Sequence, residues 1–170
     1  MHETIDQQFQ KLLLEMTAKE IRSAADAKSR ARSKVLSTEI IRFKGNVVSF
    51  STTSGTYAGK FWIQNVQLLG LRRQLDLVRD GKTTPLKAIT AAVKSGDVRV
   101  HCTCPAQKWW GWAYISTELG YKYGRKQTIF PSIRNPRLTG SVCKHLILAL
   151  GTLPFNVPGL VKTARKQGVV

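Results

Sequence analysis

The N-terminal part of the chain has the hydrophobic spacing of an amphipathic helix. Apolar side chains recur at intervals of three or four residues, as at Ile5, Phe9, Leu12 and Met16, and no Gly or Pro occurs between residues 4 and 36. This spacing is typical of an α-helix, so we predict one long helix over residues 4–36. Its second half carries cations on more than one helical face, which indicates either a solvated surface or contact with a partner.

From residue 40 the hydrophobic period changes to two, which is typical of β-strands. The alternation predicts three short strands, with turns at residues 44–46 and 54–56, where Gly interrupts the pattern. Two helices are predicted next, over residues 67–79 and 85–94, followed by a strand over residues 98–102. The apolar residues that define the first three strands are Ile41, Phe43, Val47, Phe50, Phe61, Ile63 and Val66.

The three cysteines of the chain occur in two short pairs, one of which includes a histidine. The pairs are Cys102-Thr103-Cys104 and Cys143-Lys144-His145. Thiolate and imidazole are preferred ligands of Zn²⁺, which takes four of them in a tetrahedron. Side chains alternate along a strand, so Cys102 and Cys104 point to one side and His101 to the other. We therefore predict one Zn²⁺ bound by the two pairs, without His101. The alternative is three buried free cysteines and an unrelated histidine.

The second pair precedes the apolar run at residues 146–150, which predicts a buried helix with Ser141 as its N-cap. Four protein ligands fill a zinc shell, whereas catalytic zinc keeps one position open for water. No Asp or Glu follows Glu118, and the chain shows no catalytic triad, phosphate-binding loop or carboxylate cluster. We therefore expect a structural metal and no enzymatic activity.

The charge of the chain is strongly positive. The 27 Lys and Arg residues against 10 Asp and Glu give a net charge of +17. Such a chain attracts polyanions, of which nucleic acid is the commonest. An acidic protein partner, or a basic surface without a dedicated partner, is the alternative.

The segment between the two ligand pairs, residues 105–142, interleaves aromatic residues with cations. It holds three of the four tryptophans of the chain and three of its four tyrosines. This combination is typical of contacts with single-stranded nucleic acid and of protein–protein hot spots. A local core for the segment itself is the alternative, because Trp and Tyr bury large areas. The candidate residues for nucleic-acid or partner binding are Lys108, Trp112, Tyr121, Lys122, Tyr123, Arg125, Lys126, Arg134 and Arg137.

The order C-x-C, a variable interval and then C-x-H at a helix start resembles the SWIM-type zinc finger. The resemblance covers residues 97–151 and implies a β-β-α arrangement, the same four metal ligands, and DNA or protein binding without catalysis. The interval is longer than is usual in that family. Together with Asn135-Pro136-Arg137 and the residues around Cys143, it resembles the versions that bacteriophages encode. This implies a component of a virion or of its assembly.

Taken together, these patterns indicate an α+β fold with a long N-terminal helix, a small antiparallel sheet and a zinc-bound β-loop-α module. We divide the chain into an N-terminal helical arm (1–38), an α+β domain (39–155) that contains the SWIM-like module (97–151), and a basic C-terminal tail (156–170).

The expected function is that of a non-enzymatic, zinc-binding structural protein of a phage virion, which contacts other virion or assembly proteins near DNA. An accessory or regulatory nucleic-acid-binding zinc-finger protein is the alternative. The N-terminus lacks the apolar core of a signal peptide, and no apolar stretch approaches the roughly 20 residues that span a bilayer. We therefore expect a location in the virion or the host cytoplasm, with neither a membrane nor a small molecule as partner.

Overall fold

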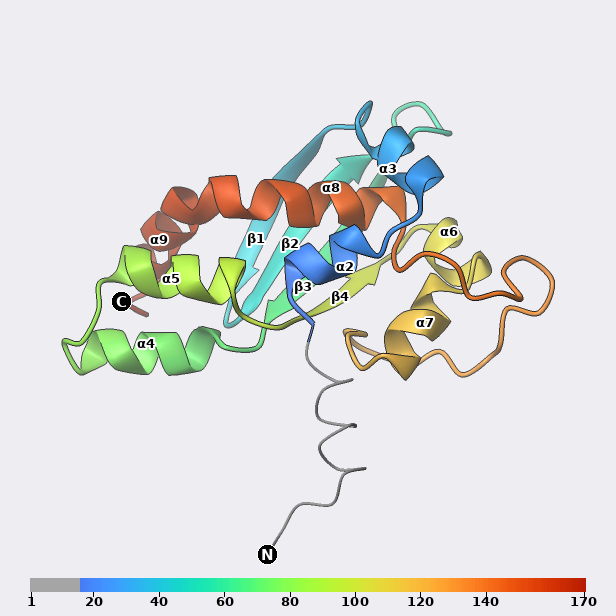
Figure 1. The fold of residues 1–170 in the computed structure, drawn as a ribbon. Coiled ribbons are helices and arrows are strands. Elements are labelled where there is room, and N and C mark those ends of the chain that lie inside the picture. Colours follow the sequence, from blue (N-terminus) through green and yellow to red (C-terminus); the bar gives the residue numbers. More distant parts are fainter. Residues whose placement is uncertain (1–15) are drawn as a thin grey trace, which may run out of the picture.

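A four-stranded antiparallel sheet forms the centre of the computed structural model, which describes residues 16–170 (Figure 1). The strands follow one another in the order of the sequence, so each pairs with the next. The turn between the first two strands places Gly45 at a positive φ of 59°, a conformation that Gly adopts without strain. The strands are β1 (Thr38–Lys44), β2 (Val47–Thr53), β3 (Phe61–Leu68) and β4 (Val98–Cys102).

One face of this sheet is covered by helices. Val48, Phe50, Val66 and Val100 lie on that face, where all four are fully buried. Four of the apolar residues that defined the predicted strands are not in this core: Ile41 and Phe61 are exposed, and Val47 and Ile63 are half-buried on the opposite face. Helix α8 runs across it and contacts all four strands (Figure 1). The helices are α2 (Ala18–Ser23), α3 (Ala27–Ser33), α4 (Leu71–Arg79), α5 (Pro85–Lys94), α6 (Pro105–Trp109), α7 (Trp112–Glu118), α8 (Lys144–Thr152), the 3₁₀-helix η1 (Leu153–Asn156) and α9 (Val157–Lys166).

The prediction of one continuous N-terminal helix was wrong for the part that the structure describes, while residues 4–15 of that prediction lie outside the described residues. Helices α2 and α3 are separate, because each has its own N-cap. The Thr17 hydroxyl accepts a hydrogen bond from the backbone N–H of Glu20, and the Glu20 carboxylate accepts one from Thr17 N–H. The Asp26 carboxylate likewise accepts from the N–H of Ser29. Both short helices pack against α8.

Two further boundaries differ from those predicted. The helix expected from residue 67 begins at Leu71, because Gln67 and Leu68 extend β3 and pair with β4. Ser141 does not cap α8, since its hydroxyl donates to the carbonyl oxygen of Ile21 at 2.6 Å and Cys143 occupies the N-cap position. Ser141 thus joins the loop that precedes α8 to helix α2.

The segment expected to be a basic tail contains helix α9. Leu160, Val161 and Ala164 of this helix are buried, and α9 contacts α5 and β1. The division of the chain into an arm, a domain and a tail stays a prediction, although both terminal segments pack against the central layer in the described part.

The helical run Lys144–Lys166 is long and apolar enough to cross a membrane by length and composition alone. The core helix of a soluble protein passes the same test. Leu146, Leu150 and Leu153 of this run are buried between the sheet and the other helices, and we interpret the run as core helices for that reason.

Candidate metal centre

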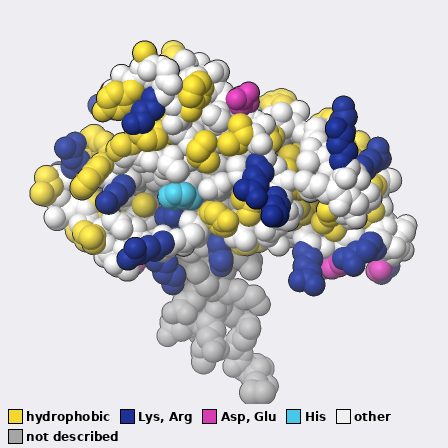
Figure 2. Space-filling view, turned by 180° about the vertical axis from the view of Figure 1, so that it is seen from behind, with side chains coloured by type: hydrophobic (Ala, Val, Ile, Leu, Met, Phe, Trp, Pro, Cys, Tyr) yellow, Lys and Arg dark blue, Asp and Glu magenta, His cyan; other side chains and the backbone are white. Residues whose placement is uncertain are grey.

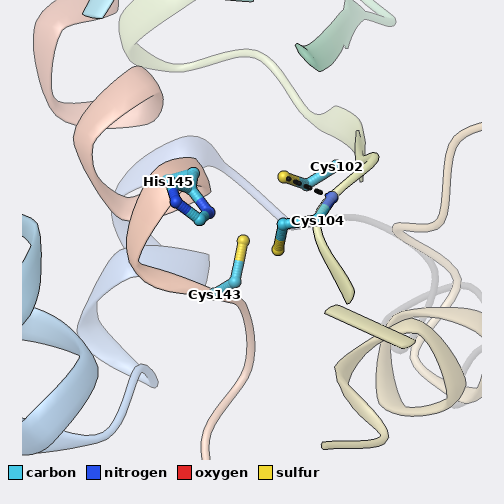
Figure 3. A group of neighbouring side chains, drawn as sticks. All are labelled: Cys102, Cys104, Cys143 and His145. Carbon is cyan, nitrogen blue, oxygen red and sulfur yellow. Dashed lines mark hydrogen bonds between the residues drawn. The ribbon is translucent and has the colours of Figure 1, made fainter. Parts of the chain in front are cut away.

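The four residues singled out by their spacing converge on one point. The Sγ atoms of Cys102, Cys104 and Cys143 and a ring nitrogen of His145 all lie within 4.8 Å of one another, and all four side chains are buried. Figure 3 shows the three thiols and the imidazole facing a common centre. These side chains can hold a metal ion. The arrangement is compatible with a zinc finger.

Two short segments supply the ligands in pairs. Cys102 ends β4, and Cys104 is the N-cap of α6, where its Sγ accepts a hydrogen bond from Gln107 N–H at 3.4 Å. Cys143 is the N-cap of α8, and His145 lies in the first turn of that helix. Backbone N–H groups are unpaired at a helix start, and they favour a thiolate there.

His101 is not part of the cluster, as strand alternation predicted. It pairs with Asn65 across the sheet, on the face opposite to the helices. Its Nδ1 lies 2.9 Å from the Nζ of Lys122. Burial, and then the charge of Lys122, lower the pKa of His101.

Two buried glutamines support the ligands, and our sequence reasoning missed both. Gln107 accepts a hydrogen bond from Cys143 N–H at its Oε1, at 3.1 Å, so it joins the start of α6 to the start of α8. The Nε2 of Gln64 donates to Cys102 Sγ at 3.4 Å. Gln64 interrupts an apolar face of β3, and this polar residue at a core position was the one available signal. Such partners orient ligands and strengthen metal binding.

The electrostatics of the cluster are unfavourable without a cation. Burial raises the pKa of Cys102 and of Cys143. The pKa of Cys104 is lowered, chiefly because the side chains of Cys102 and Cys143 hydrogen-bond to its sulfur. One buried thiolate can thus be supported by two thiols, whereas three thiolates require a positive charge among them. A divalent cation supplies that charge and displaces the thiol protons.

The imidazole of His145 gives an independent indication that a metal ion fits. Neither its Nδ1 nor its Nε2 has a hydrogen-bond partner among the described residues, and both atoms are buried. A buried polar atom without a partner costs about 1–3 kcal/mol. A bond from one ring nitrogen to a metal would remove part of that cost.

The segment between the ligand pairs has a core of its own. Asn135 is its centre: the Nδ2 group donates to the carbonyl oxygens of Trp110 and Thr139, at 3.0 and 2.9 Å. The indole N–H of Trp112 also donates to Thr139 O, at 3.2 Å, and the Tyr121 hydroxyl donates to Ser141 O at 3.0 Å. This core fixes the course of the chain between the two ligand pairs.

Burial separates the candidate binding residues into two groups. Trp112 and Tyr121 are buried in the core described above, which removes both from the candidate contact surface. Lys122 and Tyr123 are half-buried. The exposed candidates are Lys108, Arg125, Lys126, Arg134 and Arg137. A contact between these exposed residues and a partner stays a prediction.

A groove of about 1010 Å³ lies beside the Cys/His cluster, and Cys104 and His145 form part of its wall. Large apolar side chains line the groove. The composition of the chain did not distinguish these residues from core residues. Trp109 is 59% exposed and Ile133 is 92% exposed. The other exposed apolar residues of the lining are Tyr57, Trp110, Ile129 and Phe130.

No known protein family, no curated protein and no solved structure matches this chain. The likeness to SWIM zinc fingers therefore rests on the four ligands and their spacing.

We predict that Cys143→Ser abolishes stoichiometric metal binding and lowers the midpoint of thermal unfolding by about 10 °C or more. The reason is that the two ligand pairs lose their common centre, and about 1 kcal/mol corresponds to about 2–4 °C in a chain of this size. Metal analysis and a thermal melt measure both effects. The control is His101→Ala, which adjoins a ligand without belonging to the cluster and is expected to retain the metal. Equal metal content in the Cys143→Ser variant and the wild type would contradict the assignment.

We predict that Gln107→Leu weakens metal binding by about 10- to 100-fold, the usual effect of losing an outer partner of a ligand. Leucine has a similar volume but cannot accept the hydrogen bond from Cys143 N–H. Competition with a chromophoric chelator gives the affinity. Gln127→Leu is the matched control, because Gln127 lies in the same segment and is not part of the ligand network. Equal affinities of the two variants would show that Gln107 does not tune the site.

Proposed function

We propose that the metal is Zn²⁺ and that it acts as a structural ion. Three thiolates and one imidazole form a soft donor set that favours zinc over Mg²⁺ or Ca²⁺. The observation that carries this proposal is the approach of all four ligand atoms to within 4.8 Å of one another in a buried cluster. With four protein ligands, such an ion has no open position for a substrate or an activated water, so we assign no catalysis to it.

A structural ion at this point would control the segment at residues 105–142. The segment leaves the cluster at Cys104 and returns to it at Cys143, so one ion would fix both of its ends. Closing a loop of this length costs conformational entropy. Metal binding would offset that cost and hold the groove wall at Trp109, Trp110 and Ile133 in position.

The groove has the composition of a protein-docking surface. Monomeric proteins rarely expose this many large apolar side chains together. The aliphatic side chains of Ile129 and Ile133 cannot stack on nucleic-acid bases as aromatic rings do, which favours a protein partner. Lys108, Arg134 and Lys144 line the same groove, and none of the described lining residues is an Asp or Glu. The best-fitting partner is therefore a protein segment with apolar anchors flanked by acidic residues.

From these features we infer a non-enzymatic assembly protein. Zinc would order its groove, and the groove would hold it in a larger protein particle. The resemblance to phage-encoded SWIM motifs supports a virion or its assembly pathway as that particle. The groove itself supports the protein contact.

We predict that Ile133→Asp releases the protein from its assembly. A hot-spot residue at an interface contributes about 2 kcal/mol or more, roughly a 30-fold change in affinity. The full chain, tagged and produced in the cells that naturally make it, is followed by sedimentation. Wild type is expected with the large particles and Ile133→Asp in the free fraction.

The matched control is Phe155→Asp, which places the same charge at an apolar side chain that is 84% exposed and outside the groove lining. It is expected to sediment with the particles. A wild-type chain that sediments only as a free monomer would overturn the assembly role. Release by both variants would show that the added negative charge causes the release and that the groove is not the contact surface.

A further inference from the structure

The face of the sheet opposite to the helices is not covered by any described helix. Strand pairing aligns its side chains in two rows that cross all four strands. The first row is Lys44, Val47, Gln67 and Arg99, and the second is Arg42, Ser49, Asn65 and His101. Each row therefore begins with a cation on β1 and ends with a basic residue on β4.

The charge on this face is concentrated at its two edges. Arg42, Lys44 and Arg99 are exposed, and Lys122 joins the β4 edge through its contact with His101. Glu39, which pairs with Ser51 beside the second row, is the one acidic residue within the four strands. Figure 2 views the molecule from this side and shows Lys and Arg side chains distributed around a histidine.

The strip between the edges is uncharged and largely polar, apart from Val47 in the first row and Ile63 beside Ser51. Ser49 and Asn65 lie side by side, with the hydroxyl of Ser49 donating to Asn65 Oδ1 at 2.7 Å. Ser51 and Gln67 extend the strip along β2 and β3. Short hydroxyl and amide side chains of this kind commonly bind phosphate oxygens, and they carry no charge that would repel them.

The dimensions of the face suit a double-stranded polyanion. Three strand spacings separate β1 from β4, which places the basic edges roughly 14 Å apart. This span is comparable to the roughly 12 Å width of the major groove of B-DNA, so the two edges can reach phosphates on both strands. Neither row contains a Phe, Tyr or Trp ring, the usual platform for stacking single-stranded bases. The one imidazole, of His101, contacts Lys122.

We propose that this open sheet face binds the phosphate backbone of double-stranded nucleic acid, without reading its sequence. Apart from Lys122, the site uses none of the residues of the segment between the ligand pairs. It goes beyond the assembly role, because it uses neither the Cys/His cluster nor the groove.

The test compares two variants that each remove two positive charges from the zinc-loaded full chain. Arg42→Gln/Arg99→Gln removes one cation from each edge of the open face. Lys28→Gln/Arg32→Gln removes two exposed cations from α3, which packs on α8 on the other side of the sheet. The probe is a fluorescein-labelled DNA duplex of about 20 base pairs, titrated by anisotropy between about 50 and 200 mM salt.

Binding of wild type is expected to weaken steeply with salt. Each phosphate contact contributes about −0.9 to the slope of log K against log salt, so Arg42→Gln/Arg99→Gln lowers the magnitude of that slope by about 2. It also weakens binding on the order of tenfold at the lowest salt. Lys28→Gln/Arg32→Gln keeps the wild-type slope, and Ile133→Asp keeps wild-type duplex affinity.

Three results would overturn the proposal. If the two charge-matched variants weaken duplex binding equally, the duplex is attracted by the net charge of the protein alone. Equal competition by polyglutamate, at the same concentration of charges, would show a general site for acidic chains. Tighter binding of a single strand that is lost in Trp109→Ala would place the contact in the groove.

Discussion

The buried contact among three thiols and one imidazole is the constraint on which the C-terminal half of the protein depends. Its members come from the junction between β4 and α6 and from the start of α8. Without an ion, His145 has two buried ring nitrogens without partners among the described residues, and Cys102 and Cys143 resist ionisation. A divalent cation would remove both penalties at once. The same ion would also fix both ends of the segment between the pairs.

Helix α8 connects this centre to the rest of the fold. Its first turn carries Cys143 and His145, while Leu146 and Leu150 are buried in the core, so metal binding and core packing share one helix. Gln107 and Gln64 bind the two ligand pairs from α6 and β3. The groove lies on one side of this framework, and the open sheet face lies opposite to α8. The proposed protein and nucleic-acid contacts therefore do not compete for the same surface.

The ligands and the sheet could be predicted from local patterns, since C-x-C, C-x-H and strand alternation each act over a few residues. The prediction of one long helix rested on the absence of Gly and Pro. It did not take account of two N-caps, Thr17 and Asp26, each of which begins a separate helix. Gln107 could not be recognised, because its role appears only when α6 and α8 meet. Composition likewise did not distinguish buried Trp112 from exposed Trp109, whose difference depends on how residues 105–142 pack around Asn135.

The most direct test of a closed structural zinc site is zinc K-edge X-ray absorption on the purified full chain. We expect three sulfur atoms at about 2.3 Å and one nitrogen at about 2.0–2.1 Å around each zinc. That shell contains Cys102, Cys104, Cys143 and His145 and no exchangeable water. A shell with an oxygen ligand and fewer than three sulfurs, or a stably folded chain that binds no zinc, would contradict it.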